Sequence, residues 1–589
     1  MERSLKDRFD THIAPEHLET PSVPRLSENA MWLLEQRYFV PRWDASMGGL
    51  RKEGSFEEFT RRIARTIASA ETLYLDPEAP GSLEWLQVLE KNIASDILNR
   101  RFLFNSPCLF SSAAGLTVQP EFAELLYKRV DAMSFEDYVR IHSARTKNQQ
   151  LFACFVINVP DSIEGIFESV RDASVISKFG GGVGGNFGHL REFGSEIGGG
   201  TGGKASGPVS FMETWNTMGA VVVQGGKRRA ALMGMLFDDH PDIYRFVDCK
   251  TEDGKLSYFN VSVAVSDKLM QEASRDGTFD LRSRVDGSVV RTVSARELMD
   301  HISESAWKRG DPGVFFIDRA RQDNLLKMDP DWDIESTNPC GEQPLPNYTS
   351  CNLGSINVEV FAKDGEFDWS GFRDQVFRSM YYLDLVIDAC SYPLPRIGER
   401  TRRIRPVGLG IMGLADASII QGIVYGSPEF ELYCRDLGCA LAASALSATA
   451  QIVSEAGKEP FPEHPLVHDL FAAFKSEVEG GEGLFSEGTL FSDSWFERLS
   501  REECGQLLSH MKSSELVPLT LANTLSELDN PLSGLDFEGI KAILKSLVNG
   551  QLRNSRRLSI APTGSISMIL DASSGIEPNF AWSWNRHIA

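Results

Sequence analysis

Near the middle of this chain of 589 residues lies the stretch Thr337-Asn-Pro-Cys-Gly-Glu-Gln-Pro-Leu-Pro346. Its prolines exclude a helix, because proline lacks a backbone N–H and restricts the residue that precedes it. We therefore expect an extended loop. Side chains two residues apart in extended backbone point to the same side, so Asn338, Cys340 and Glu342 are predicted to converge. An amide, a thiol and a carboxylate would then share one small volume.

This combination favours chemistry over packing. A lone cysteine is most often a small buried residue, and a rigid loop around such a cysteine is the alternative interpretation. The polar neighbours of Cys340 on the same face, and the prolines that fix the loop, favour a chemical role. Two further cysteines stand out: Cys351 follows after a short interval, and Cys154 lies in the apolar run Leu151–Val159, which taken alone predicts a buried strand.

The composition is that of an acidic globular protein. Apolar residues make up 42% and charged residues 24% of the chain, and the formal net charge is −22. Such a charge repels polyphosphates at long range, which argues against a protein that coats nucleic acid. The nine cysteines include no CxxC pair, which argues against a zinc site or a disulfide framework. No apolar run of about 18 residues and no secretory signal is seen, so we expect a cytoplasmic protein without a membrane partner.

The first hundred residues are predicted to be mostly helical. Ser55 followed by Glu58 matches a capping box, and apolar residues then repeat at helical spacing. From about residue 100 to residue 360, short β-branched and apolar runs alternate with helical stretches, as is typical of α/β construction.

Helices predominate again in the later part of the chain. One long helix is predicted between Ser427, which precedes a proline, and Gly457. The segment 457–494 is rich in Glu, Gly and Pro, which predicts a surface excursion.

Several further motifs carry a family resemblance that runs from about residue 28 to the last residue. They are Asn105-Ser-Pro-Cys108, Ala153-Cys-Phe-Val156, Gly180–Gly185, Thr201-Gly-Gly-Lys-Ala-Ser-Gly-Pro208, Gln224-Gly-Gly-Lys-Arg-Arg229, Asp239-His-Pro-Asp242, Gly408-Leu-Gly-Ile-Met-Gly413, Ala561-Pro-Thr-Gly564 and Ser573-Ser-Gly-Ile-Glu-Pro578. Together with Asn338-x-Cys340-x-Glu342 they resemble the ribonucleotide reductases. The short interval from Cys340 to Cys351 most resembles the class that depends on adenosylcobalamin.

The resemblance implies an α/β fold. A helical region over 1–100 would lead into a ten-stranded α/β barrel over 101–589, built from two parallel five-stranded halves around the Cys340 loop. A mainly helical part is expected around 365–555. The last barrel strands, and the cysteine pair with which the family usually ends, are expected to be missing, as in a truncated chain or one part of a split enzyme. Only residues 1–27 precede the first family-like segment, so no nucleotide-binding cone that switches overall activity is expected.

The resemblance also implies roles for the residues quoted first. Cys340 would carry a thiyl radical that abstracts the ribose 3′-hydrogen, Glu342 would accept the 3′-hydroxyl proton, and Asn338 would hydrogen-bond the ribose hydroxyls. Cys154 and Cys351 would protonate the leaving 2′-hydroxyl and supply two electrons, ending as a disulfide. Their Cα atoms must then approach within about 7 Å. The implied cofactor is adenosylcobalamin, and no metal site formed by protein side chains is expected.

Substrate and effector sites follow from the same resemblance. Residues 561–567 offer backbone N–H groups and hydroxyls in a loop predicted to lead into a helix N-terminus, although an ordinary turn is the alternative. The implied substrate-binding residues are Ser106, Ala153, Gly182, Pro562, Thr563, Gly564, Ser565 and Ser567. The implied effector-binding residues are Asp161, Arg191, Gln224, Lys227 and Arg228. The glycine run Gly180–Gly185 and the basic cluster 227–229 are assigned to the apparatus that reads the effector.

One motif is rejected and several alternatives stay open. Gly408-x-Gly410-x-x-Gly413 matches a dinucleotide-binding fingerprint, but it follows the charged segment Arg402–Pro406 rather than an apolar strand.

The remaining six cysteines are interpreted as structural. The expected partners are a ribonucleoside di- or triphosphate, a deoxynucleotide or ATP effector, a thioredoxin-like or glutaredoxin-like reductant, a second copy of the chain and a possible C-terminal polypeptide. The alternatives are the large subunit of a class I reductase, which needs a separate radical-generating subunit, and a complementing fragment that is inactive alone.

Overall fold

The computed structural model describes residues 26–197, 202–222, 230–479, 490–528, 530–579 and 581. The chain divides into two compact units. The first unit comprises residues 1–151, 352–391 and 402–589, and the second comprises residues 152–351 and 392–401. Strand β15 (Thr349–Asn357) belongs to both, because the chain passes from the second unit to the first within it.

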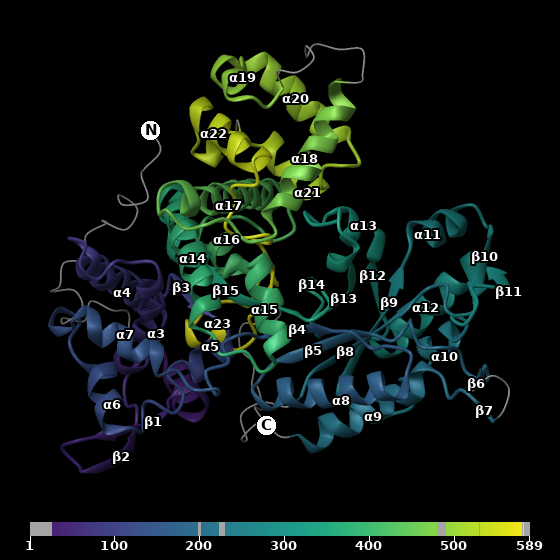
Figure 1. Cartoon of the computed structure of the whole chain (residues 1–589), viewed down its shortest axis with the longest axis horizontal. Helices are drawn as coiled ribbons and strands as arrows, with labels where there is room; N and C mark the ends of the chain where they lie inside the picture. The colour runs from purple at the N-terminus through teal and green to yellow at the C-terminus, as the bar shows by residue number, and fades with distance from the viewer. Residues whose placement is uncertain are drawn as a thin grey trace. The chain divides into compact units, whose positions relative to one another are not determined.

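The second unit is built on five parallel strands in the order β12-β9-β8-β5-β4 (Figure 1). Their bounds are β4 (Cys154–Ile157), β5 (Gly182–Asn186), β8 (Leu232–Phe237), β9 (Phe259–Val265) and β12 (Gly313–Phe316). The first three residues of β15 pair antiparallel with β4. Four of the five strands are almost wholly buried, as expected for parallel strands that are covered on both faces. A parallel five-stranded half of an α/β barrel is therefore confirmed.

Helices lie in the connections between these strands, because parallel neighbours need a long crossover. Helix α8 (Ile163–Lys178) joins β4 to β5, and α9 (Pro208–Val221) lies between β5 and β8; the two pack against each other along one face of the sheet (Figure 1). The unit's other elements are β6 (Glu196–Ile197), β7 (Gly203–Lys204), α10 (Ile243–Val247), α11 (Asp267–Ser274), β10 (Thr278–Arg282), β11 (Val289–Ser294), α12 (Ala295–Arg309), α13 (Ile317–Gln322), β13 (Ile334–Thr337) and β14 (Pro344–Pro346).

The N-terminal part of the first unit is mostly helical, as predicted, with one hairpin. Its elements are α2 (Glu28–Leu33), the π-helical turn η2 (Leu34–Tyr38), β1 (Pro41–Asp44), β2 (Gly49–Lys52), α3 (Phe56–Ala68), α4 (Ser82–Leu98), β3 (Phe102–Phe104), α5 (Ser106–Ser111), α6 (Pro120–Tyr127) and α7 (Phe135–Ser143). Ser55 caps α3 by accepting a hydrogen bond from Glu58 N at 3.2 Å. The reciprocal bond of a capping box is not formed, because the Glu58 carboxylate instead binds Gly54 N and Arg51.

The long predicted helix is α17 (Pro428–Ser454). The Ser427 hydroxyl caps its first turn, and Gly457 follows it with a φ of +65°. This helix is long and apolar enough to cross a membrane, but 78% of its most apolar window is buried inside the fold. It packs on α14 (Trp369–Ala389) and is a core helix of the first unit.

The predicted surface excursion at 457–494 is only partly correct. Residues 464–479 form helix α18 (His464–Glu479), in which Val467, Leu470, Phe471 and Phe474 are buried. This spacing places one apolar stripe against α22 (Phe537–Val548). The helical periodicity of the apolar residues therefore decides the structure of this segment more than its Glu and Pro content does. Residues 480–489 lie outside the described residues.

The remaining elements of the first unit include two strands that pair with β15. Strand β18 (Val407–Met412) pairs parallel with the second part of β15, and β3 pairs antiparallel with it. The others are β16 (Ala362–Lys363), β17 (Glu366–Phe367), α16 (Leu414–Ile420), α19 (Asp493–Arg498), α20 (Arg501–Ser513), α21 (Leu519–Ser526) and α23 (Ile566–Ile569); α15 (Pro395–Ile404) spans the boundary between the units.

The rejected glycine motif follows helix α15 and the charged residues at its end, as the sequence indicated, and is itself the buried strand β18 instead of a turn after a strand. Its glycines are explained by close packing. A Cβ on Gly410 would lie 2.2 Å from the Ser559 carbonyl oxygen, and one on Gly413 would lie 2.2 Å from Asn357 Oδ1. Gly413 also has a φ of +79°, which favours glycine.

Candidate active site

The Cys340 stretch is a β-hairpin with a tight turn. Strands β13 and β14 pair antiparallel, with Thr337 opposite Pro344, and the chain reverses over residues 338–343. Gly341 has a φ of +85°, and its N–H donates to the Asn338 carbonyl at 3.0 Å. The predicted extended backbone is therefore wrong over the turn. Asn338 and Glu342 do converge, but they do so because the turn folds back on itself.

Strand register brings the two predicted redox cysteines together. Cys351 on β15 lies directly opposite Cys154 on β4 in an antiparallel pair. Directly opposite residues in such pairs have Cα atoms about 4.5–5.5 Å apart, so the approach that the resemblance demands is met. Both residues are buried, with exposures of 2% for Cys154 and 0% for Cys351. Their roles in a reaction stay a prediction.

A small polar cluster joins the hairpin turn to this pair. Asn338 Nδ2 donates to Cys154 Sγ at 3.1 Å and to Glu342 Oε2 at 2.6 Å. The Cys154 thiol in turn donates to Glu342 Oε1 at 3.7 Å. Gln343 N donates to Asn338 Oδ1 at 2.9 Å, which fixes the orientation of the Asn338 amide. An amide, a carboxylate and a thiol are thus held in mutual contact.

Cys340 differs from the other cysteines in its exposure. All nine cysteines lie in described residues, and Cys340 at the tip of the turn is the exposed one. Burial raises the pKa of Cys108, Cys249 and Cys390 to about 12, so these thiols stay protonated near neutral pH. Such environments suit structural cysteines, and a structural role for these three stays a prediction.

The glycine run lies beneath the hairpin. A Cβ on Gly184 would lie 1.7 Å from the Thr337 carbonyl oxygen, and one on Gly182 would lie 2.8 Å from Pro339 Cγ. Because they have no side chain, these glycines allow the hairpin to pack directly on strand β5. Gly182 lies against Pro339, the residue before Cys340. The substrate-binding role of Gly182 and the role of the run in reading an effector both stay predictions.

The implied phosphate loop lies in the first unit. It leads directly into a helix, α23, although this helix has only four residues. The Thr563 hydroxyl accepts from Gly575 N at 2.7 Å, and the Ser567 and Ser574 hydroxyls are 3.1 Å apart. Pro562 is exposed, and Gly564 and Ser565 are half-buried. The fold thus engages two of the implied hydroxyls and leaves the other residues nearer the surface.

The other implied substrate residues lie in separate elements. Ser106 is the first residue of α5 in the first unit, and its hydroxyl lies 2.9 Å from the Tyr38 hydroxyl. Ala153 immediately precedes β4 in the second unit, and its carbonyl accepts from Gly182 N at 2.8 Å.

Two of the implied effector residues form an ion pair in the second unit. Arg191 donates to Asp161 through Nε at 2.9 Å and through its backbone N–H at 3.1 Å. This pairing raises the pKa of the Arg191 guanidinium above its ordinary value. Gln224, Lys227 and Arg228 lie outside the described residues.

Sequence reasoning missed two asparagines that hold the hairpin. Asn186, at the end of β5, donates through Nδ2 to the Glu335 carbonyl at 2.7 Å. Asn260, on β9, donates through Nδ2 to the Pro339 carbonyl at 2.7 Å. The available signal was weak: Asn260 is the single amide in the otherwise apolar or small run Phe259–Val265.

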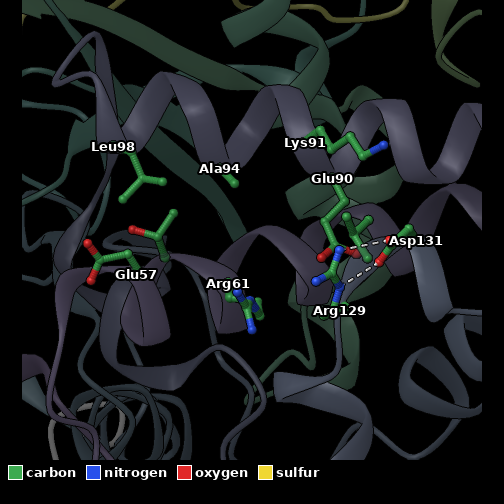
Figure 2. Close-up of a pocket in the computed structure, with 10 residues that line it drawn as sticks. Glu57, Arg61, Glu90, Lys91, Ala94, Leu98, Arg129 and Asp131 are labelled. Carbon is green, nitrogen blue, oxygen red and sulfur yellow. Dashed lines mark hydrogen bonds and ion pairs between the residues drawn. The ribbon is translucent and has the colours of Figure 1, made fainter. Parts of the chain in front are cut away.

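A separate pocket in the first unit contains none of the predicted site residues (Figure 2). It lies between α3, α4 and residues 129–131, and it is lined by Glu57, Thr60, Arg61, Glu90, Lys91, Ala94, Leu98, Arg129, Val130 and Asp131. Arg129 pairs with Asp131, as Figure 2 shows, and Glu90 is bound by Arg65. Within the described ranges, no cluster of His, Cys, Asp or Glu is suited to hold a metal ion.

Comparison with known proteins agrees with the resemblance. Residues 152–589 match the family described as "Ribonucleotide reductase, barrel domain". The chain is 37% identical over 586 residues to the vitamin B12-dependent ribonucleoside-diphosphate reductase of Thermoplasma acidophilum, which covers 96% of this chain and 65% of that protein. It is 31% identical over 565 residues to the enzyme of the same name from Mycobacterium tuberculosis strain CDC 1551, covering 96% of this chain and 63% of the relative.

A third relative is the vitamin B12-dependent ribonucleotide reductase of Streptomyces avermitilis, 27% identical over 94% of this chain and 52% of its own length. The chain thus spans between 52% and 65% of the length of these relatives. The match to the barrel domain covers the β4–β15 sheet, the Cys340 hairpin and the segment around α23. The chain therefore belongs to the ribonucleotide reductase family.

Proposed function

We propose that this chain forms the catalytic body of an adenosylcobalamin-dependent reductase that converts ribonucleoside diphosphates to 2′-deoxyribonucleoside diphosphates. One observation carries the proposal: the Cys154–Cys351 pair lies in cross-strand register beside Asn338 and Glu342, with Cys340 exposed on the same turn. The names of the similar proteins support vitamin B12 dependence and favour a diphosphate substrate.

Cys340 begins the reaction in this proposal. The ribose 3′ C–H bond has no acidic proton, so it yields to a radical rather than to a base. A Cys340 thiyl radical would take the 3′-hydrogen atom, restoring the thiol and leaving a carbon radical on the ribose. The exposure of Cys340 suits direct contact with a bound nucleotide.

Glu342 and Asn338 would act on the ribose hydroxyls. The Glu342 carboxylate would accept the 3′-hydroxyl proton as a general base, while the Asn338 amide would orient the hydroxyls. Both side chains are already fixed by their mutual bond at 2.6 Å, and Asn338 is also held through Oδ1 by Gln343 N. A preset arrangement of this kind reduces the reorganisation needed when substrate binds.

The cysteine pair would supply the two electrons. A proton from one thiol would convert the leaving 2′-hydroxyl to water, and the pair would finish as a disulfide while the 2′ carbon gains hydrogen. Cys340 then returns the 3′-hydrogen atom and becomes a thiyl radical again. The balance is one ribonucleotide plus one dithiol giving one deoxyribonucleotide, one disulfide and water, so an external reductant must restore the dithiol.

The residues present fit the implied cofactor in one testable respect. Of the three proposed active-site cysteines, Cys340 is exposed to an external radical source, whereas Cys154 and Cys351 are buried. When bound, adenosylcobalamin supplies a radical by homolysis of its cobalt–carbon bond. Among the described residues, we assign only Cys340 to lie beside it.

Regulation and partners complete the proposal. The substrate phosphates would bind at Thr563, Gly564, Ser565 and Ser567, and a deoxynucleotide effector would bind near Asp161 and Arg191. A thioredoxin-like or glutaredoxin-like protein would reduce the disulfide, and a second copy of the chain and a C-terminal polypeptide are further expected partners. The protein would act in the cytoplasm.

The test is an anaerobic turnover assay. The purified chain is incubated with a ribonucleoside diphosphate, a matched deoxynucleotide effector and dithiothreitol, with or without adenosylcobalamin, and the deoxynucleotide product is measured. We expect product only with the cofactor, loss of product in Cys340→Ser, and retention of product in the matched control Cys434→Ser, which alters a half-buried cysteine on α17. Product that needs a separate radical-generating subunit, or no product under any condition, would contradict the proposal.

A further inference from the structure

We infer that Asn260 is a positioning residue that sets the location of Cys340 by holding the Pro339 carbonyl. The effect on catalysis rests on the function proposed above, whereas the hydrogen bond from Asn260 to Pro339, here called the tether, is a property of the fold. Asn260 Nδ2 donates to the Pro339 carbonyl oxygen at 2.7 Å. Pro339 directly precedes Cys340, so the bond acts at the peptide that joins the two residues.

Backbone contacts matter here because Cys340 is an exposed residue at the tip of a turn. The location of its sulfur depends on where its own backbone lies, and that backbone follows the anchoring of the turn to the sheet beneath it. The ring of Pro339 packs on Gly182, and the Thr337 carbonyl packs on Gly184. A Cβ at either glycine would clash with the hairpin.

The strand register explains why Asn260 reaches this turn. Asn260 on β9 pairs with Met233 on β8, and Met233 pairs with Gly184 on β5. Residues in register across a sheet share a face, so Asn260 lies on the same face as Gly184. This is the face on which the hairpin rests. Asn260 is the exposed residue of an otherwise buried strand, and its amide reaches from there to the hairpin.

The backbone on both sides of Asn260 is itself fixed. Lys250 Nζ donates to the Phe259 carbonyl at 2.5 Å and to Asp311 Oδ2 at 2.6 Å. Asp311 Oδ1 accepts from Val261 N at 3.3 Å. The ion pair therefore pins the residues before and after Asn260, so its amide is presented from a rigid support.

A second amide acts in the same way farther from the cysteine. Asn186 Nδ2 donates to the Glu335 carbonyl at 2.7 Å. The bound carbonyls thus belong to residues 335 and 339, on either side of the Thr337 carbonyl that rests over Gly184. We expect the Asn260 tether to matter more for Cys340, because it acts one residue away instead of five.

The consequence for catalysis follows from geometry. Hydrogen-atom transfer requires the sulfur to lie in contact with the ribose carbon that it attacks. A displacement of about 1 Å at a reacting group can cost on the order of 100-fold in rate. Loss of the Asn260 tether is therefore expected to lower kcat by between about 10- and 100-fold and to leave KM within about twofold.

Three variants and one control separate positioning from packing. Asn260→Asp keeps the size of the side chain but replaces the donor with an acceptor, so a packing role would be spared and a tether would be lost. Asn260→Ala removes both, and Asn186→Ala removes the more distant tether. The control is Asn216→Ala, which removes a comparable hydrogen bond, the one that Asn216 Oδ1 accepts from Tyr258 N at 3.0 Å.

Turnover is measured alongside a readout that needs no activity. The rate at which iodoacetamide alkylates Cys340 is followed by peptide mass spectrometry, with the buried cysteines as an internal reference for folding. Both Asn260 variants should raise this rate by about threefold or more, because a loosened tip exposes the thiol further. The Asn216 control should match the unaltered chain, and Asn186→Ala should fall between them.

Normal alkylation and normal kcat in both Asn260 variants would overturn the inference, as would loss of kcat in Asn260→Ala that Asn260→Asp restores. If the unaltered chain makes no product, the proposed function fails. The alkylation rates still decide whether Asn260 holds the turn, so the two failures are distinguishable.

Discussion

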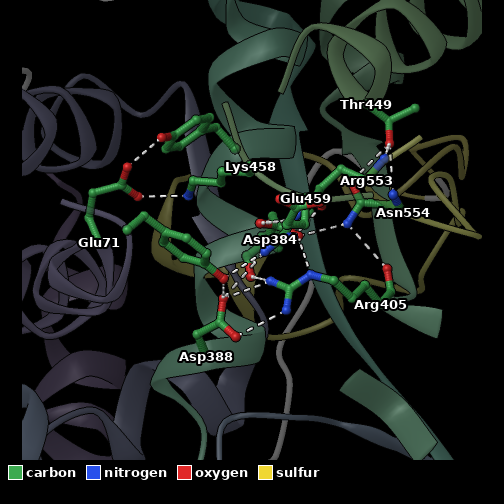
Figure 3. Close-up of polar contacts among 12 residues, drawn as sticks. Glu71, Asp384, Asp388, Arg405, Thr449, Lys458, Glu459, Arg553 and Asn554 are labelled. Carbon is green, nitrogen blue, oxygen red and sulfur yellow. Dashed lines mark hydrogen bonds and ion pairs between the residues drawn. The ribbon is translucent and has the colours of Figure 1, made fainter. Parts of the chain in front are cut away.

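Arg405 lies at the centre of a buried ionic network in the first unit (Figure 3). Its Nε donates to Asp384 Oδ1 at 2.9 Å, and its terminal nitrogens donate to both oxygens of Asp388 at 3.0 and 2.7 Å. Arg553 donates to the other Asp384 oxygen at 3.1 Å, and Tyr74 donates to Asp388 at 2.7 Å. Arg405 and both aspartates are buried.

We predict that Arg405→Met destabilises the protein strongly. Methionine has a similar length but no charge, so Asp388 would keep the Tyr74 hydroxyl and an Arg553 nitrogen only at 3.9 Å. Removing one partner of a buried ion pair leaves an uncompensated charge and typically costs about 3–5 kcal/mol. We expect a loss in this range at pH 7.

The loss should depend on pH in a defined direction. Burial alone would raise the pKa of Asp388, but the Arg405 guanidinium outweighs it and holds that pKa below its ordinary value. A carboxyl with a depressed pKa stabilises the fold above its unfolded pKa of about 3.9, and this contribution is lost as the pH falls. Without Arg405, burial dominates and Asp388 takes up a proton at mildly acidic pH. The difference between variant and parent should therefore shrink between pH 7 and about pH 5.

Urea unfolding followed by circular dichroism at both pH values measures these differences. The matched control is Arg435→Met on α17, where the arginine side chain is 63% exposed and pairs with Asp436, so a change below about 0.5 kcal/mol is expected. Adding Asp388→Asn to Arg405→Met should recover part of the loss, because it removes the stranded charge. A cost below about 1 kcal/mol at pH 7, or a cost that grows on acidification, would refute this reasoning.

Three further predictions concern the candidate site. Under the anaerobic assay, Cys154→Ser or Cys351→Ser should abolish dithiothreitol-driven multiple turnover while leaving the urea midpoint nearly unchanged; sustained turnover in either variant would exclude the pair as the electron source. Gly184→Ala should displace the hairpin, because the added Cβ meets the Thr337 carbonyl at 1.7 Å, and both turnover and the native rate of Cys340 alkylation should change. Asp161→Ala should weaken effector binding measured by calorimetry by about 1–2 kcal/mol; unchanged binding would place the effector elsewhere.

The sequence predicted the architecture best where a local rule governs it. The five parallel strands follow from apolar runs that alternate with helical segments, and α17 follows from Ser427 and the distant Gly457. Periodicity could also have found α18, whose apolar stripe was obscured by neighbouring Glu, Gly and Pro residues. Composition averages over a segment, whereas burial depends on the spacing of single residues.

Local rules failed at the Cys340 turn. The prolines correctly excluded a helix, but they did not distinguish an extended loop from a hairpin, because both accept proline. The deciding residue was Gly341, whose positive φ lets the chain reverse. Pairing between distant segments was equally hidden: nothing near Cys351 in sequence indicates that Cys154 lies opposite. That contact entered the prediction through the family resemblance alone.

The Arg405 network has a consequence beyond stability, because it fixes the register of two neighbouring segments. Asn554 Nδ2 donates to Asp384 Oδ1 at 3.0 Å and to the Arg405 carbonyl at 3.2 Å. Immediately afterwards, residues 556–559 run beside β18, with Leu558 bridged in parallel to Leu409. This segment leads into the implied phosphate loop at 561–567.

A slip of one residue in such a pairing would turn every side chain to the opposite face. Apolar contacts tolerate such a slip better than directional bonds, since burial is roughly proportional to area and has no direction. Charged groups that must meet specific partners disfavour a register slip. Fixing the register in this way is the best-attested role of buried polar groups. We therefore expect the network to set where Thr563 and Ser567 lie, and Arg405→Met to weaken nucleotide binding even at temperatures at which the variant remains folded.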